Sequence, residues 1–110
     1  MIVYKKAWLS IGYFSGFVIV RMLVNARQVI RPHDTRKLRA LRAKVLSITD
    51  IDDHHSHHDQ CQSRRYSHQA VPLEYVVGKY AVANGLDRDR NNDCGQGIHF
   101  FRTRKEAVEY

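Results

Sequence analysis

A chain of 110 residues is long enough for one domain with a single modest core. Its apolar fraction of 44% and charged fraction of 26% are ordinary for a soluble globular protein, and its two cysteines exclude a disulfide framework. The net charge of +7 is uneven, because residues 1–48 carry ten Lys or Arg against one acid and residues 49–110 carry eight against ten. The basic half favours an anionic partner such as a nucleic acid, a nucleotide, an anionic membrane or an acidic protein, although solubility explains the same charge equally well.

The first predicted element is a β-hairpin with a long connection. Ile2–Trp8 and Phe17–Val24 are rich in β-branched and aromatic residues, and residues 12–16 between them supply turn glycines. The second strand is apolar on both faces, which predicts a central position or cover on both sides. The uncharged run over residues 7–20 is shorter than the roughly 18 residues of a membrane span. We therefore expect a soluble hairpin and neither a signal peptide nor a membrane anchor.

A short helical turn is predicted next, over residues 26–30, with Asn25 as its cap and Pro32 as its stop. The following segment, residues 36–46, fits either a helix or a strand. The apolar residues Leu38, Leu41, Val45 and Ile48 recur at helical spacing, with Lys37, Arg39, Arg42 and Lys44 outside that stripe. Residues 43–48 also alternate as a strand does, and periodicity does not decide between the two.

Residues 49–69 almost lose the apolar signal and carry four aspartates and five histidines. This composition predicts a flexible, polar, His-rich loop at about 49–69. Beyond it, residues 74–82 predict a strand broken at Gly78, and residues 84–97 form a polar turn region.

The clearest local pattern lies at the C-terminus, where a short apolar run, Ile98–Phe101, precedes a capping box formed by Thr103 and Glu106. A helix should run from there to Tyr110, with Ala107 and Tyr110 facing the core. The elements together predict an α+β fold in one domain, residues 1–110. It contains a small antiparallel β-sheet and one or two short helices, with the C-terminal helix packed on the sheet.

Three stretches carry a family resemblance: Tyr4-Lys5-Lys6-Ala7, the run over residues 37–48, and residues 94–110, which contain Cys-x-x-Gly-Ile-His-Phe-Phe. Tyr75-x-x-Gly78-Lys79 also fits. Together they resemble a family of uncharacterised domains from phages and giant viruses, often found after pentapeptide repeats. The resemblance spans nearly the whole chain and implies a viral protein acting in the host cytoplasm. Leu38 stands where that family usually has a cysteine, so a role pairing that thiol with Cys94 is not expected here.

Metal ligands gather in the His-rich loop, where imidazoles and a thiol occur close together. The candidates are His54, His55, His57, His58 and Cys61. Structural zinc sites usually draw paired ligands from separate rigid elements, whereas these all lie on one polar segment. We therefore expect no metal and no cofactor.

Cys94 and His99 could be imagined as a nucleophile and its base, but no motif supplies an oxyanion hole or an orienting group. We expect both to have packing roles. The Gly-x-Gly at residues 95–97 is too short for a dinucleotide fingerprint. An enzyme that uses Cys94 or a loop metal is accordingly the third-ranked function.

Basic side chains flank the predicted start of the last helix, where free N–H groups attract anions, and a second basic stripe lies at residues 37–44. Guanidinium groups hold phosphates well, and aromatic side chains can stack beside them. The predicted ligand-binding residues are Lys37, Arg39, Arg42, Tyr75, His99, Arg102, Arg104 and Lys105.

The sequence thus predicts a non-enzymatic viral accessory module, a homo-oligomer, that binds an anionic small molecule. The resemblance to phage genes makes a nucleotide-type signal of host defence the candidate ligand. The alternative is a viral protein-interaction or structural module, marked by an exposed apolar patch at Trp8, Tyr13 or Phe14. No nucleic-acid-binding motif is present, so recognition of a specific DNA or RNA sequence is not expected.

Overall fold

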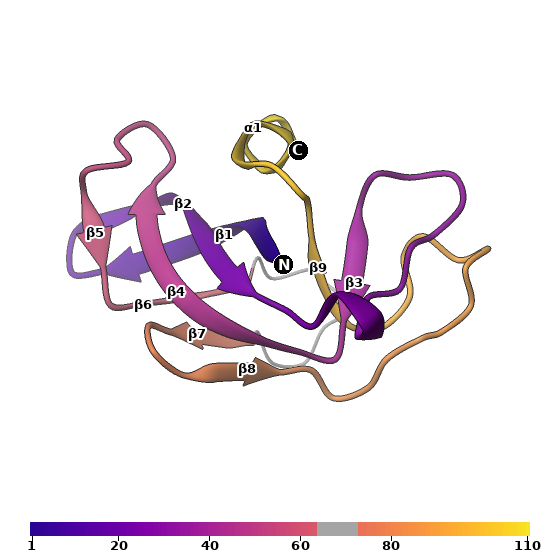
Figure 1. The fold of residues 1–110 in the computed structure, drawn as a ribbon. Coiled ribbons are helices and arrows are strands. Elements are labelled where there is room, and N and C mark those ends of the chain that lie inside the picture. The colour runs from indigo at the N-terminus through magenta and orange to yellow at the C-terminus, as the bar shows by residue number, and fades with distance from the viewer. Residues whose placement is uncertain (64–72) are drawn as a thin grey trace.

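The computed structural model describes residues 1–63 and 73–110, and Figure 1 shows a curled antiparallel sheet beside a small two-stranded ribbon and a C-terminal helix. The described strands are β1 (Ile2–Ile11), β2 (Phe14–Leu23), β3 (Leu38–Ala40), β4 (Arg42–Asp50), β5 (His57–His58), β6 (Gln60–Gln62), β7 (Glu74–Val76), β8 (Tyr80–Val82) and β9 (Ile98–Phe100). The helical elements in the same residues are a 3₁₀ turn, η1 (Ala26–Gln28), and one short helix, α1 (Arg104–Glu109).

The hairpin of β1 and β2 pairs along its whole length, with Ile11 opposite Phe14. Its turn is therefore only two residues long, Gly12 and Tyr13. Gly12 has a φ of 57°, a conformation that glycine adopts at little cost. The predicted hairpin is confirmed, but the predicted long connection is wrong, because cross-strand pairing extends both strands through Ser10, Ser15 and the glycine that follows.

The main sheet has the order β5-β4-β2-β1-β6-β7, and β8 also pairs with β4. A turn at Gly78, which has a φ of 86°, leads from β7 into β8. β7 is the last strand in the sheet order and β8 pairs with β4 near the other end, so this turn joins the two sides of the sheet. The Gly78 N–H donates to the Val45 carbonyl over 2.9 Å, and the Val45 N–H donates to the Lys79 carbonyl over 2.9 Å. These bonds help to curl the sheet into a half-barrel. The predicted break at Gly78 is confirmed.

The core lies on the concave face of this sheet. Strand alternation points every second side chain of β1 and β2 inward, and the β3–β9 ribbon adds its own apolar face. The buried residues of the core include Val3, Ala7, Val18, Val20, Met22, Leu38, Ala40, Val45, Ile48, Cys61, Tyr75, Ile98 and Phe100.

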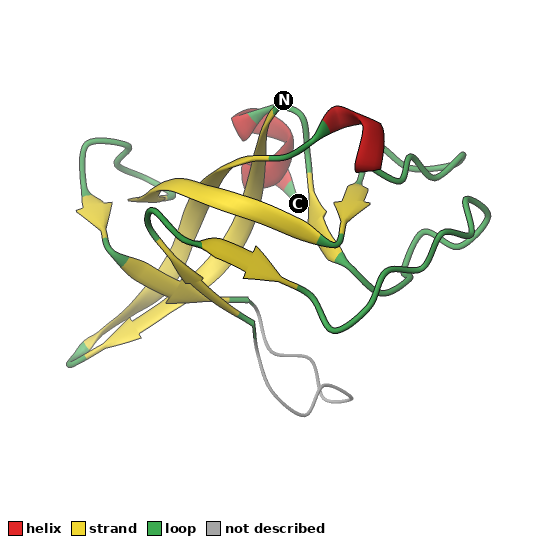
Figure 2. Ribbon diagram, turned by 60° about the horizontal axis from the view of Figure 1, so that its bottom comes forward, coloured by secondary structure: helices red, strands yellow, loops and turns green. Residues whose placement is uncertain are grey.

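Helix α1 covers the opposite face of β1 and β2, as Figure 2 also shows. Ala107 on α1 and Ile19 on β2 are both buried outside the main core. Because β2 is covered on both faces and lies between β1 and β4, its predicted central position is confirmed. Tyr110 was predicted to face the core but is 60% exposed, since it lies beyond the last turn of α1.

The fold is a small, mostly antiparallel β fold with a C-terminal helix on the sheet, so the predicted α+β class overstates its helical part. Thr103 caps α1 as predicted: its hydroxyl accepts from the Glu106 N–H over 3.2 Å and donates to the Glu106 carboxylate over 2.9 Å. Asn25 caps η1 by accepting from the Arg27 N–H. Both caps depend on neighbouring residues alone.

The segment that fitted helix or strand consists of strands β3 and β4, separated by Leu41. The predicted loop at 49–69 is wrong for part of its length. Residues 49 and 50 end β4, and β5 and β6 follow within the polar segment because β5 pairs with β4 and β6 with β1 and β7. Residues 64–69 of that predicted loop lie outside the described residues.

Candidate functional site: a basic groove

The residues predicted to bind a ligand do not form one site. Arg39 and Tyr75 are buried, His99 and Lys37 lie around the β3–β9 ribbon, and Arg42 stands on the outer face of β4. Arg102, Arg104 and Lys105 belong to the start of α1.

Arg39 is 1% exposed and holds the loop of residues 84–97 from inside. Its Nε donates to the Asp87 carbonyl over 2.8 Å, its Nη1 to the Asn92 carbonyl over 2.6 Å and its Nη2 to the Asp89 carbonyl over 2.7 Å. A guanidinium bonded in this way is closed off from solvent and from ligands. Arg39 therefore stabilises a loop and does not belong to a binding surface.

His99 holds the same loop from the paired position on β9, opposite Arg39. Its Nε2 is hydrogen-bonded to the Gly95 carbonyl. Burial lowers the pKa of His99 to about 4, and the cations Lys5, Lys37 and Arg39 act in the same direction. The ring is therefore neutral at pH 7. Because Nε2 already contacts a carbonyl, this geometry gives no support to a nucleophile–base pair with Cys94.

The glycines of the C-terminal motif are explained by packing in this loop. A Cβ at Gly95 would lie 2.6 Å from the Cβ of Asp87, and Gly97 has a φ of 140°. Both positions therefore require glycine without any bound phosphate. The Cys-x-x-Gly-Ile-His-Phe-Phe sequence therefore belongs to a loop that is fixed by hydrogen bonds and close packing and that leads into β9.

Tyr75 is fully inside the core, and burial raises the pKa of its hydroxyl above the usual range. Lys5, which sequence reasoning did not select, lies close by on the inward-facing side of β1. Its Nζ donates to the His99 carbonyl over 3.0 Å, and burial, helped by Lys37, lowers its pKa to about 8. Alternation with Val3 and Ala7 was the signal that could have placed it inside.

A basic groove lies between residues 31–38 and the C-terminal segment. We define it by its lining residues, which are Arg31, Pro32, Thr35, Arg36, Leu38, Arg102, Thr103, Lys105, Glu106 and Glu109. Its volume is about 630 Å³. Two cations come from each wall, so a ligand entering the groove would meet positive charge on both sides.

Two glutamates offset part of this charge. The Glu106 carboxylate accepts from Thr103 and lies 3.9 Å from the guanidinium of Arg36, whose side chain is 88% exposed. Four cations against two carboxylates leave the groove with a charge of about +2. The first-turn carboxylate of Glu106 also suits the helix start, so the capping box, and not a bound anion, satisfies that end of α1.

Arg104 faces away from the groove and connects α1 to the end of β4. Its Nη2 donates to the carbonyls of Asp50 and Ile51 over 3.1 and 3.3 Å. Of the predicted ligand-binding residues, the structure therefore brings Arg102 and Lys105 together in the groove. Sequence reasoning missed Arg31 and Arg36, although the basic run around Pro32 was a usable signal.

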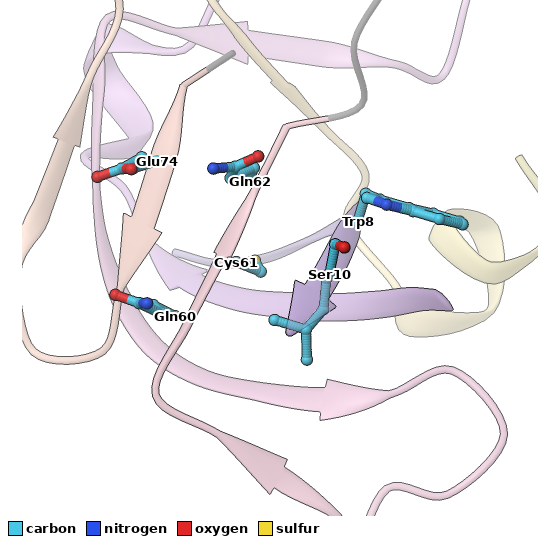
Figure 3. Close-up of a pocket in the computed structure, with 7 residues that line it drawn as sticks. Trp8, Ser10, Gln60, Cys61, Gln62 and Glu74 are labelled. Carbon is cyan, nitrogen blue, oxygen red and sulfur yellow. The ribbon is translucent and has the colours of Figure 1, made fainter. Parts of the chain in front are cut away.

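A second, much smaller cleft lies between β1, β6 and β7. Figure 3 shows Trp8, Ser10, Gln60, Cys61, Gln62 and Glu74 around it. Its volume of about 50 Å³ and its neutral or acidic lining suit a few waters and not an anion.

The weak metal-ligand candidates do not form a set of three in the described residues, although the rings of His54 and His55 lie 4.2 Å apart. No group of three His, Cys, Asp or Glu converges among residues 1–63 and 73–110. His58 is bonded through Nε2 to the Asp50 carboxylate over 2.6 Å, which lowers the pKa of Asp50. Cys61 points into the core, where burial raises its pKa to about 12, while Cys94 is an exposed free thiol.

A family of unknown function (DUF5758) matches residues 1–107. No curated protein and no solved structure matches the chain. Within the described residues, no helix is long and apolar enough to cross a membrane.

Proposed function

The chain belongs to this family of unknown function, and we propose that it works as a non-enzymatic module that binds an anionic small molecule in the basic groove. The observation that carries the proposal is the placement of Arg31 and Arg36 on one wall and Arg102 and Lys105 on the other. Guanidinium groups bind phosphate and carboxylate through paired hydrogen bonds.

The size of the groove supports a ligand larger than a single phosphate. Ligand sites commonly measure roughly 300–1,000 Å³, and the groove lies inside that range at about 630 Å³. Leu38 and Pro32 add an apolar portion beside the cations. A nucleotide combines an anionic end with a flat, weakly polar base and fits this lining.

The resemblance to phage and giant-virus domains directs the choice of first ligands. If this chain is a viral accessory protein acting in the host cytoplasm, nucleotide signals of host defence are the candidates to test first. The proposal itself requires only the charge and shape of the groove.

The test is thermal shift followed by calorimetry with a panel of cyclic and linear nucleotides and inorganic pyrophosphate. We expect at least one member to bind the parent protein with an affinity that weakens as salt rises. The double variant Arg102→Gln/Lys105→Gln should lose binding by tenfold or more. Lys79→Gln, which removes an exposed cation from a distant turn, is the matched control. No binding across the panel, or equal binding by the two variants, would overturn the proposal.

A second candidate function is protein recognition through the tip of the hairpin. Tyr13 and Phe14 are exposed there, as expected of an interaction module, and Ile11 is exposed beside them, whereas Trp8 is half-buried. Binding of a host or virion protein should then persist in 0.5 M salt and be lost in Tyr13→Ser/Phe14→Ser, whereas the groove variant should keep it.

A further inference from the structure

The outer faces of β2, β4 and β8 meet in a second exposed surface, none of whose residues lines the groove. Lys44 on β4 is paired with Leu23 on β2 and with Tyr80 on β8, and Arg42 is paired with Val82. Directly paired residues share a face of the sheet. We call these five residues, Leu23, Arg42, Lys44, Tyr80 and Val82, the Tyr80 face. Figures 1 and 2 show β4 and β8 side by side.

The intervening residues fix the direction of this face. Ala43, Val45 and Ala81 are buried in the core, so alternation turns their neighbours outward. Tyr80 is 54% exposed, Val82 52% and Leu23 42%. The face therefore presents to solvent a large aromatic ring and one aliphatic side chain from β8 and a second aliphatic side chain from β2.

Two cations lie beside the ring. The guanidinium carbon of Arg42 lies 4.2 Å from the centroid of Tyr80, where it covers one side of the ring and holds its orientation. Lys44 lies next to Tyr80 across the strand pair, and Arg21, two residues before Leu23 on β2, is exposed on the same side. None of the paired positions of this face is an aspartate or a glutamate.

An aromatic ring held against a guanidinium, with further cations on the same face of the sheet, is the combination that binds single-stranded nucleic acid. Bases stack on the ring while cations neutralise the phosphates beside it. Cores of protein–protein interfaces, by contrast, are depleted of charged residues. We propose that the Tyr80 face binds single-stranded polynucleotide without sequence preference. The ring and the flexible cations recognise what all nucleotides share, and the proposal stands independently of the groove.

The experiment measures fluorescence anisotropy of 5′-fluorescein dT₁₅ and rU₁₅ with the parent protein at 50 and 200 mM NaCl. We expect saturable binding that weakens with salt. Tyr80→Ala should weaken the affinity about tenfold, which is the loss of one base–aromatic stack. Tyr80→Phe keeps the ring and should bind with the affinity of the parent. Arg42→Gln should reduce the slope of log K against log salt by about 0.7, the value for one phosphate contact on a single strand. Tighter binding of one probe than the other identifies the RNA or the DNA strand as the partner.

The matched control is the groove variant Arg102→Gln/Lys105→Gln, which removes the same kind of charge elsewhere and should keep oligonucleotide binding within about twofold. Tyr80 and Arg42 are exposed, so we expect all variants to unfold at temperatures close to the parent. Absence of binding at 50 mM salt overturns the proposal. So does equal binding by Tyr80→Ala and Tyr80→Phe, because the charge alone would then explain the affinity. A loss confined to the groove variant would place the polynucleotide in the groove and not on the Tyr80 face.

Discussion

Replacement of Arg39 by methionine tests whether the loop of residues 84–97 depends on one buried guanidinium. Methionine keeps much of the length and volume of the side chain but removes all three donors. Hydrogen bonds from a charged donor contribute about 1.5–3 kcal/mol each, so three bonds give an upper range of about 4.5–9 kcal/mol. Part of this is offset, because the loop carbonyls regain water and the cost of burying the charge disappears. We expect a net loss of about 3–5 kcal/mol, similar to removing one member of a buried charged pair.

Urea denaturation at pH 7, followed by far-UV circular dichroism, measures this loss, and hydrogen exchange of residues 87–96 locates it. Arg39→Lys keeps the charge with one nitrogen and cannot reach three carbonyls, so it should lose most of the same stability. Arg36→Met removes an exposed guanidinium and should change stability by no more than about 0.5 kcal/mol. If Arg39→Met were as stable as Arg36→Met, with unchanged exchange in the loop, the role assigned to the guanidinium would be wrong.

Three further outcomes follow from the same region. His99 has a pKa of about 4 in the fold and about 6.5 when unfolded. The unfolded chain therefore binds more protons between these values, and the free energy of unfolding should fall as pH drops from 6.5 towards 4. The urea midpoint of His99→Gln should fall less than that of the parent over this range. The fall that persists in the variant arises from Asp50 and other carboxylates. A thiol reagent should label one cysteine, the exposed Cys94, in the native protein and two in denaturant, and Cys94→Ser should show no native labelling, because Cys61 is buried with a pKa of about 12. Gly95→Ala places a Cβ 2.6 Å from the Asp87 side chain and should cost about 1–3 kcal/mol, whereas Gly16→Ala meets Phe14 at an ordinary 3.5 Å and should cost less; equal losses would contradict the packing argument.

The parts of the fold that sequence predicted are those decided by neighbouring residues. The Asn25 cap, the capping box at Thr103 and Glu106, and the glycine turns depend on local hydrogen bonds and on φ alone. The β-branched and aromatic composition also predicted the hairpin, and the apolar residues on both faces of its second strand predicted the cover on both faces of β2. The length of the turn between β1 and β2 was missed, because cross-strand partners extend a strand through serines and a glycine that have little strand preference of their own.

The basic groove was harder to predict from the sequence, because its two walls come from segments that are far apart in the chain. Arg36 lies near α1 because β3, which follows it in the chain, pairs with β9, which precedes α1. Arg39 reaches carbonyls 48 to 53 positions away. Such a contact depends on where backbone oxygens of an irregular loop point. The amino-acid sequence does not predict where these carbonyl oxygens point. An arginine that is buried and holds a loop therefore cannot be told from a ligand-binding arginine by sequence alone.

The basic run from Lys37 to Lys44 shows how this difference changes the functional interpretation. As a helix it would present one cationic stripe, and Arg39 and Arg42 would serve the same ligand. As two strands it divides: Arg39 points into the loop of residues 84–97, while Arg42 and Lys44 stand on the Tyr80 face. The two arginines should therefore respond in opposite ways to removal. Arg39→Met should lower the free energy of unfolding and leave oligonucleotide affinity unchanged once the variant is measured below its unfolding temperature. Arg42→Gln should leave stability near the parent value and lower that affinity. A shared response in both measurements would mean that the basic run acts as one surface after all.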